Sequence, residues 1–204
     1  MNGFADKIVE LLTSIGVSES DIYVKTKRDL PGYFRPHKGW DILVVSGKQL
    51  HATIELKSQV GPSFGNNFNN RSEEAIGSSE DFWTAYREKA FADSPQPWLG
   101  YLFMLEDCPE SHIKRGVNEP HFPVLPVFKD TSYAQRYEIL CRRLVLERKY
   151  SSACLILADS EKSNLLENYS EPAVDLSVNQ FLTQLLSHMS MVSSLAKNKQ
   201  TTLI

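Results

Sequence analysis

Two carboxylates and an ammonium lie within a segment that otherwise has the pattern of a buried β-hairpin. The segment GWDILVVSGKQLHATIELKSQ, residues 39–59, carries Asp41, Glu55 and Lys57 around a Gly-Lys turn. With a three-residue turn at residues 47–49, Asp41 falls opposite Glu55, and side chains directly opposite on paired strands lie about 5 Å apart. The sequence therefore predicts that these two carboxylates are neighbours.

The same hairpin predicts a metal site. Side chains alternate between the two faces of a strand, so Glu55 and Lys57 share one face while Ile54 and Leu56 point the other way. Two adjacent carboxylates repel each other unless a cation lies between them, and hard oxygen ligands of this kind suit Mg²⁺. The alternative is a set of ordinary salt-bridged charges on an edge hairpin, which an isolated Glu-x-Lys pattern would favour.

The elements around the hairpin are predicted from hydrophobic periodicity and turn residues. In chain order they are a helix over about 4–15, a strand in 21–26, hairpin strands over about 40–46 and 50–58, a helix over 72–91, and a strand buried on both faces in 97–107. This order is αβββαβ. Beyond it we expect a Pro-rich connection over 107–129, a helix over about 133–149, a strand in 153–158 and a last helix over about 177–196.

Length and composition set limits on the class of protein. The 204 residues suit one domain, with a core of about 1–107 and a C-terminal extension of about 130–196. We expect a cytoplasmic protein, because no run of eighteen apolar residues and no signal peptide is present. Three widely spaced cysteines offer neither a disulfide framework nor a zinc site. The net charge of -3 leaves the partner open.

Four stretches carry a resemblance to a known family. Asp41 followed by Glu55-Leu56-Lys57 resembles the PD-(D/E)xK nuclease core, with Trp40 in place of the Pro. The chain is most similar in pattern to the XhoI family of type II restriction endonucleases, most clearly over residues 29–107. The stretches that carry this resemblance are GYFRPHKGWDILVV, IELKSQVGPSFGNNFNNRSEEAIG, FWTAYREKAF and PWLGYLFMLED.

The resemblance implies a fold, a reaction and a set of roles. It implies an α/β, restriction-endonuclease-like core with a central mixed sheet flanked by helices, forming a single nuclease domain. The implied reaction is Mg²⁺-dependent cleavage of both strands of duplex DNA by a homodimer, with 5′-phosphate ends, at CTCGAG or a longer site containing it. Asp41, Glu55 and the Leu56 backbone carbonyl would hold the metal, and Lys57 would orient the attacking water. The resemblance also implies a location in the cytoplasm of a bacterium or archaeon, and a cognate DNA methyltransferase as a functional partner.

Several polar residues are candidates for contacts with DNA. The stretch after the second hairpin strand, expected just ahead of a helix, holds Asn66, Asn67, Asn69, Asn70 and Arg71. Asn and Arg can bond adenine and guanine through two hydrogen bonds, whereas the alternative is a turn-rich loop with Asn in caps. Gln59 is either a phosphate contact or a plain polar strand end.

A basic segment leads into the site and is a candidate for holding the DNA backbone. It contains Lys25, Lys27, Arg28, Arg35, His37 and Lys38. The alternative is a solvated run of charges. An apolar stripe on the last helix predicts either a dimer interface or intramolecular core. The stripe consists of Leu182, Leu185, Leu186, Met189 and Val192.

Two other functions remain open at this point. A structure-specific repair or recombination nuclease would use the same Asp41, Glu55 and Lys57. A serine hydrolase would use the G-x-S-x-G pattern of residues 61–65, with Ser63 as nucleophile. Its partners would be His188 and either Asp159 or Asp175, in the chain order that this class requires.

Overall fold

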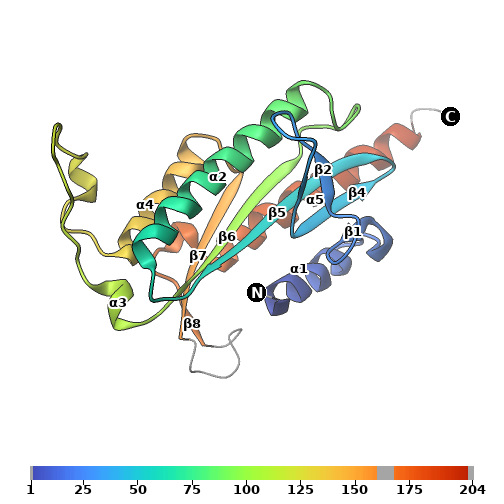
Figure 1. Cartoon of the computed structure of the whole chain (residues 1–204). Coiled ribbons are helices and arrows are strands. Elements are labelled where there is room, and N and C mark those ends of the chain that lie inside the picture. Colours follow the sequence, from blue (N-terminus) through green and yellow to red (C-terminus); the bar gives the residue numbers. More distant parts are fainter. Residues whose placement is uncertain (1, 160–167, 202–204) are drawn as a thin grey trace.

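A six-stranded mixed sheet forms the centre of the computed structural model, which describes residues 2–159 and 168–201 (Figure 1). The strand order is β1-β4-β5-β6-β7-β8, in which β5, β6 and β7 are parallel and the outer pairings are antiparallel. The strands are β1 (Ile22–Tyr23), β4 (Ile42–Ser46), β5 (Gln49–Gln59), β6 (Trp98–Glu106), β7 (Ser152–Ala158) and β8 (Tyr169–Ser170). The predicted α/β class with a mixed central sheet is confirmed.

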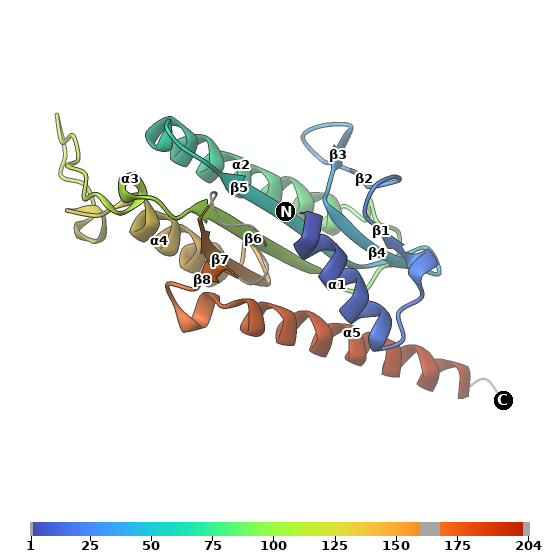
Figure 2. The ribbon, with the colours of Figure 1, turned by 90° about the horizontal axis from the view of Figure 1, so that it is seen from below.

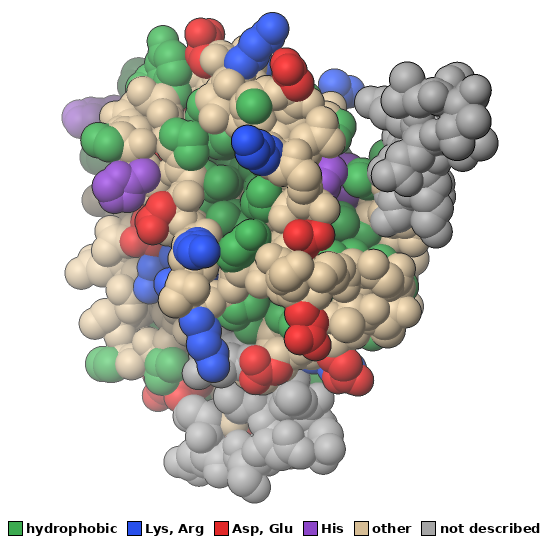
Figure 3. Space-filling model, turned by 90° about the vertical axis from the view of Figure 1, so that its right-hand side faces the viewer, with side chains coloured by type: hydrophobic (Ala, Val, Ile, Leu, Met, Phe, Trp, Pro, Cys, Tyr) green, Lys and Arg blue, Asp and Glu red, His purple; other side chains and the backbone are tan. Residues whose placement is uncertain are grey.

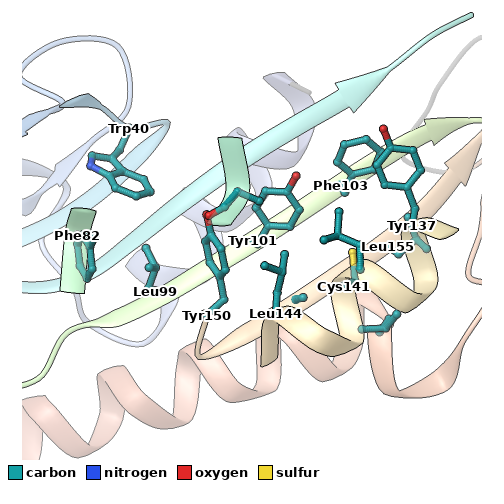
Figure 4. Close-up of a cluster of buried hydrophobic side chains, with 14 of the residues drawn as sticks. Trp40, Phe82, Leu99, Tyr101, Phe103, Tyr137, Cys141, Leu144, Tyr150 and Leu155 are labelled. Atoms are coloured by element: carbon teal, nitrogen blue, oxygen red, sulfur yellow. The ribbon is translucent and has the colours of Figure 1, made fainter. Parts of the chain in front are cut away.

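Helices cover both faces of this sheet (Figure 2). One face packs against α1 (Asn2–Ser14) and α5 (Val178–Thr201), and the other packs against α2 (Phe64–Arg87) and α4 (Tyr133–Leu146). On the second face, aromatic rings from β6 and α4 stack in the interior, with Phe103 and Tyr137 only 4.1 Å apart between ring centroids (Figure 4). No helix in residues 2–159 or 168–201 is long and apolar enough to cross a bilayer.

The β4–β5 hairpin has the predicted register, but its turn differs from the predicted one. Gly47 and Lys48, both at positive φ, form a two-residue turn that pairs Ser46 with Gln49. The register then shifts by one residue between Val44 and Val45, which leaves His51 as the extra residue of a bulge. The predicted three-residue turn is therefore wrong.

The two-residue turn and the one extra residue of the bulge together make three residues, which is the length of the predicted turn. Ile42 pairs with Ile54, so Asp41, the residue before β4, falls opposite Glu55. Without the bulge, the strand would slip by one residue and every side chain of β4 would face the wrong partner.

Helix α2 begins at Phe64 rather than at Ser72. Residues 66–71 therefore form its first turns, and the prediction that they lie in a loop ahead of the helix is wrong. Asn and Gly disfavour helix interiors, but the rings of Phe64 and Phe68 pack on Tyr133 and Tyr137 of α4. This tertiary packing outweighs the local propensity.

Two further differences concern short elements and the last helix. A two-stranded sheet of β2 (Asp29–Pro31) and β3 (His37–Gly39) precedes β4 and was not expected. The other short elements are η1 (Glu19–Asp21), α3 (Pro109–His112), η2 (Pro126–Phe128) and η3 (Val174–Leu176). On α5, the stripe packs mainly inward: Leu185 and Met189 are buried, and Leu182 and Leu186 lie against the same core. It is intramolecular core, so the prediction that it forms the dimer interface is not supported.

Candidate active site

Asp41 binds the open edge of β5. Strand β4 begins at Ile42, whereas β5 continues to Gln59, so the edge of β5 beyond Glu55 has no strand partner on that side. Asp41 Oδ2 accepts a hydrogen bond from the backbone N–H of Leu56 at 2.7 Å. Because both backbone groups of a strand residue point to the same side, the Leu56 carbonyl also faces the side of Asp41.

Glu55 is a buried carboxylate held by two ammonium groups. Its side chain is 3% exposed, and Lys38 Nζ and Lys57 Nζ lie 2.7 Å and 2.5 Å from its two oxygens. Lys57 is on the same face of β5, as the alternation predicted. A buried carboxylate without a partner would be strongly destabilising, and the two lysines offset the burial of Glu55.

The short β2–β3 sheet brings two of the cations to the site. Lys38 lies on β3, and its Nζ is also 4.1 Å from the centroid of the Trp40 ring. Arg28 directly precedes β2, and its Nη1 lies 3.6 Å from Asp41 Oδ1. The sequence assigned both residues to a basic segment that holds the DNA backbone, but here their nearest partners are the two carboxylates.

The site opens toward solvent on one side. Side-chain exposure rises from 13% at Lys38 to 28% at Lys57, 34% at Asp41 and 36% at Arg28. Three cations (Arg28, Lys38, Lys57) against two carboxylates leave an excess of one positive charge, which suits an anionic substrate entering from the Asp41 side.

The donor atoms fit a divalent metal. In the part of the chain that the structure describes, no group of three or more His, Cys, Asp and Glu side chains is arranged to hold a metal ion. Mg²⁺, however, is usually bound by one or two carboxylates together with water and a substrate phosphate. Asp41 and Glu55 on paired positions, together with the Leu56 carbonyl on the Asp41 side of β5, offer that set of oxygen donors.

Gln59 lies in the interior rather than at a DNA-facing surface. It is 3% exposed, and its Oε1 accepts a hydrogen bond from the hydroxyl of Tyr137 on α4. It shares the face of Glu55 and Lys57, as predicted. Its Nε2, the atom that could donate to a phosphate, is buried and has no hydrogen-bond partner among the described residues.

The other predicted DNA contacts are spread over α2 and the β2–β3 loop. Asn66, Asn69 and Asn70 are exposed on the first turns of α2, whereas Asn67 and Arg71 are half-buried. Arg71 Nη1 is 2.5 Å from Glu74 Oε2 one turn further along the helix. The Asn residues form one open helix surface, and they do not contact the Asp41–Glu55 site.

Asp81 is an important residue that the sequence reasoning missed. It lies on the buried side of α2, is 4% exposed, and accepts hydrogen bonds from the N–H groups of Tyr33 and Phe34 at 2.8 Å each. Arg35 Nε donates to its other oxygen at 2.7 Å. Burial raises the pKa of Asp81, but the bonds from Arg35, Phe34 and Tyr33 outweigh burial and keep the pKa below its ordinary value.

The helical spacing of the residues around Asp81 could have indicated from the sequence that its side chain is buried. Ser78 and Ala85 lie one turn before and after it, and both are buried. A carboxylate on the apolar stripe of a helix needs a buried partner, which is a reason to search for one.

The residues required for a serine hydrolase do not come together. Ser63 lies beyond the end of β5, whereas His188 of α5 contacts the backbone carbonyl of His51 near its start, at 3.1 Å. The strand between His51 and Gln59 alone spans about 26 Å. Asp175 is bound to Arg142. The geometry therefore contradicts the G-x-S-x-G interpretation.

A cavity of about 890 Å³ lies at the end of the molecule seen in Figure 3, where hydrophobic side chains gather in a hollow between charged ones. Its lining includes Val17, His51, His188 and Met189. His51 is about 13 Å along β5 from Glu55, so this cavity is separate from the carboxylate pair.

Comparisons with known proteins identify the family of the chain. The sequence model of the restriction endonuclease XhoI family matches residues 1–171. The chain is 52% identical over 200 residues to the type II restriction enzyme BstVI of Geobacillus stearothermophilus, covering 96% of this chain and 89% of that protein. It is 50% identical over 151 residues to the type II restriction enzyme XhoI of Xanthomonas vasicola, covering 72% of this chain and 60% of the other.

A third relative extends the pattern. The type II restriction enzyme AbrI of Azospirillum brasilense is 52% identical over 123 residues, covering 60% of this chain and 55% of that protein. No solved structure matches the chain. Since the family match spans most of the sequence and the first relative aligns over nearly its whole length, the chain belongs to the XhoI family of restriction endonucleases.

Proposed function

We propose that this protein is a type II restriction endonuclease that uses Mg²⁺ to hydrolyse both strands of duplex DNA. The observation that carries the proposal is the opposition of Asp41 and Glu55 across the hairpin, with Lys57 bound to Glu55. The target is CTCGAG or a longer site containing it, as the family resemblance implies. Cleavage leaves 5′-phosphate and 3′-hydroxyl ends.

Each residue of the site has a role in this reaction. Asp41, Glu55 and the Leu56 carbonyl would hold the Mg²⁺, and the ion would supply Lewis acidity when bound. Lys57 binds Glu55 with one N–H, and its two remaining donors can hold the attacking water and a phosphate oxygen. Arg28 orients Asp41 and adds positive charge where the phosphate enters.

The larger assembly follows from the substrate. A palindromic site read by two copies of the chain matches two-fold symmetry, so we propose a homodimer. We further propose that residues 1–204 form one nuclease domain, since β7 and α5 complete the same sheet and core as the hairpin. The enzyme would work in the cytoplasm of a bacterium or archaeon, beside a methyltransferase that protects the host sites.

The experiment is a digest of plasmids of known sequence with Mg²⁺. We expect discrete, reproducible fragments, and sequencing of their ends should place the cuts at CTCGAG or within a longer site. Smeared products, or cuts at junctions and flaps rather than in a linear duplex, would replace this proposal with a structure-specific repair nuclease that uses the same residues. Plasmid methylated at the target by a cognate methyltransferase should stay intact.

A further inference from the structure

The loop between β2 and β3, residues 32–36, ends in two exposed aromatic side chains. Tyr33 is 54% exposed and Phe34 is 70% exposed. Their rings meet edge to face, with centroids 4.9 Å apart. Large apolar side chains that lie together at a projecting tip indicate a contact surface more often than isolated ones do. We call this pair the aromatic tip.

The backbone that carries the aromatic tip is fixed from beneath. The N–H groups of both aromatic residues donate to Asp81, which α2 holds in the interior. A side chain at Gly32 would meet Asp81 Oδ2 at 2.6 Å and the Arg35 carbonyl at 2.7 Å, so the loop closes over the carboxylate only because glycine stands there. A pre-formed loop loses little conformational entropy on binding.

The same hairpin reaches into the active site. Four residues after Phe34, Lys38 binds Glu55, and Arg28 at the other end of the hairpin lies by Asp41. Four residues of chain extend at most about 14 Å. The aromatic tip is therefore carried by the same short hairpin that supplies Lys38 and Arg28 to the carboxylates, so a duplex that reaches Asp41 and Lys57 passes beside this hairpin.

Positive charges lie on the same hairpin as the aromatic tip. Arg35 directly follows Phe34 and uses its Nε for Asp81 while its side chain remains 42% exposed, and Lys25 and Lys27 are exposed just before β2. A hairpin that carries both cations and exposed rings suits a surface that meets phosphates and bases.

We propose that Tyr33 and Phe34 enter the DNA groove next to the cleaved phosphate and pack against bases and sugars there. The inference rests on the proposed function, because it takes duplex DNA as the ligand of the neighbouring site. The two rings are positioning residues: they seat the duplex so that one phosphate reaches the Asp41–Glu55 pair. Asp81 holds them ready before DNA arrives.

The test uses the full-length enzyme with both rings removed, Tyr33→Ala/Phe34→Ala. Binding is measured by fluorescence anisotropy with Ca²⁺, and cleavage with Mg²⁺, on a duplex containing the site found in the plasmid digest. We expect binding to the target duplex to weaken by about 10- to 100-fold. Binding to an unrelated duplex should weaken much less, because it depends mainly on phosphate contacts.

Two controls separate this role from a general effect. Phe122→Ala removes a ring that is 85% exposed on the segment between α3 and η2, and it should change binding less than about twofold. Tyr33→Phe/Phe34→Tyr keeps both rings and should restore most of the binding. Because the two side chains are exposed, the melting temperature should not change in either double variant.

Three outcomes would overturn the inference. The first is a Tyr33→Ala/Phe34→Ala enzyme that binds and cuts the target as the parent does. The second is an equal loss in Phe122→Ala, and the third is an equal loss on target and unrelated DNA. In all three cases the parent still cuts DNA, so only the aromatic tip is refuted. A parent that neither binds nor cuts duplex DNA would refute the proposed function, and this inference with it.

Discussion

Two adjacent hairpins of this protein are held in place by different physical means. The β4–β5 hairpin is part of the central sheet, and residues such as Leu43 and Ile54 are buried in the cores on its two faces. The β2–β3 hairpin stands outside that sheet, and charged groups hold it: Asp81 binds its loop, and Lys38 binds Glu55. Packing on both faces fixes the first hairpin, whereas the second has one core residue, Leu30, and is held mainly by hydrogen bonds and ion pairs to Asp81 and Glu55.

The difference separates two requirements of a metal-dependent nuclease. The oxygen ligands must be held rigidly, and residues locked by packing provide that. The cations and the aromatic tip must meet a duplex that approaches from solvent, and the β2–β3 hairpin presents them at the surface on a loop that Asp81 fixes. Changes in the first hairpin should therefore alter the chemistry, whereas changes around the second should alter DNA binding, stability and their dependence on pH.

The largest effect is expected at Asp41. Asp41→Asn keeps an oxygen that can accept the Leu56 N–H but removes a charged metal ligand, so cleavage of supercoiled plasmid with Mg²⁺ should fall by about a thousandfold. Asp6→Asn, at an exposed position on α1, serves as the matched control and should cut normally. An Asp41→Asn enzyme within tenfold of the parent rate would show that Asp41 holds no metal.

Lys57 is the next test of the β4–β5 hairpin. In Lys57→Ala the attacking water loses its positioning ammonium, and cleavage should fall by about a hundredfold or more. Binding of DNA in a shift assay with Ca²⁺ should largely survive, because most of the affinity comes from other contacts. Lys7→Ala removes a surface lysine paired with Glu10 and should change neither measurement. If the Lys57→Ala enzyme cut DNA at the parent rate, the pair of Lys57 and Glu55 would be an ordinary salt bridge without a catalytic role.

Asp81 tests how the β2–β3 hairpin is held. Asp81→Asn removes the negative charge of the carboxylate that accepts hydrogen bonds from Tyr33, Phe34 and Arg35. The free energy of unfolding, measured in urea, should therefore drop by about 1.5–3 kcal/mol. Glu80→Gln is the control one residue earlier, since Glu80 is exposed and pairs with Lys149 on the surface; it should cost at most about 1 kcal/mol. Equal effects of the two substitutions would mean that Asp81 does not anchor the loop.

The smallest effect concerns pH. The pKa of Asp81 in the folded protein is lowered, so its contribution to stability is fully present above its unfolded pKa of about 3.9 and is lost as the pH falls through the folded value. The difference in unfolding free energy between the parent and Asp81→Asn should therefore shrink from pH 7 to pH 3. A difference that stays constant would mean that the carboxylate does not titrate with folding.

The features that could be predicted from the sequence are those with a strong local pattern. Alternation along β5 placed Glu55 and Lys57 on one face, and continuous apolar runs identified β6 and β7. These patterns extend over enough residues to be recognised. The opposition of Asp41 and Glu55 was predicted from a three-residue turn that the hairpin lacks, and it holds because the two-residue turn and the bulge span the same number of residues. Strands of three residues such as β2 and β3 have no such periodicity, so that sheet was missed.

The remaining errors involve contacts between distant parts of the chain. The start of α2 depends on rings of α4, and the role of Asp81 depends on a loop far earlier in the sequence. Lys38 was a candidate for a contact with the DNA backbone because its segment is basic, and the structure adds a partner that the sequence did not indicate, Glu55. The local sequence shows that a charged residue is present, but it does not show which residue that charge contacts in the folded protein.

The bulge at His51 has a consequence for how this hairpin can vary among natural or engineered variants. The two-residue turn and the extra residue together determine which residue of β5 faces Asp41. One residue added at Gly47–Lys48 can be taken up in two ways that keep Asp41 opposite Glu55: as a three-residue turn with the bulge retained, or as a two-residue turn with the bulge lost. The turn and the bulge therefore act as a reserve for changes in length. One residue inserted between Ala52 and Glu55 has no such outlet, so it should move Glu55 away from Asp41 and inactivate the enzyme without replacing a catalytic side chain.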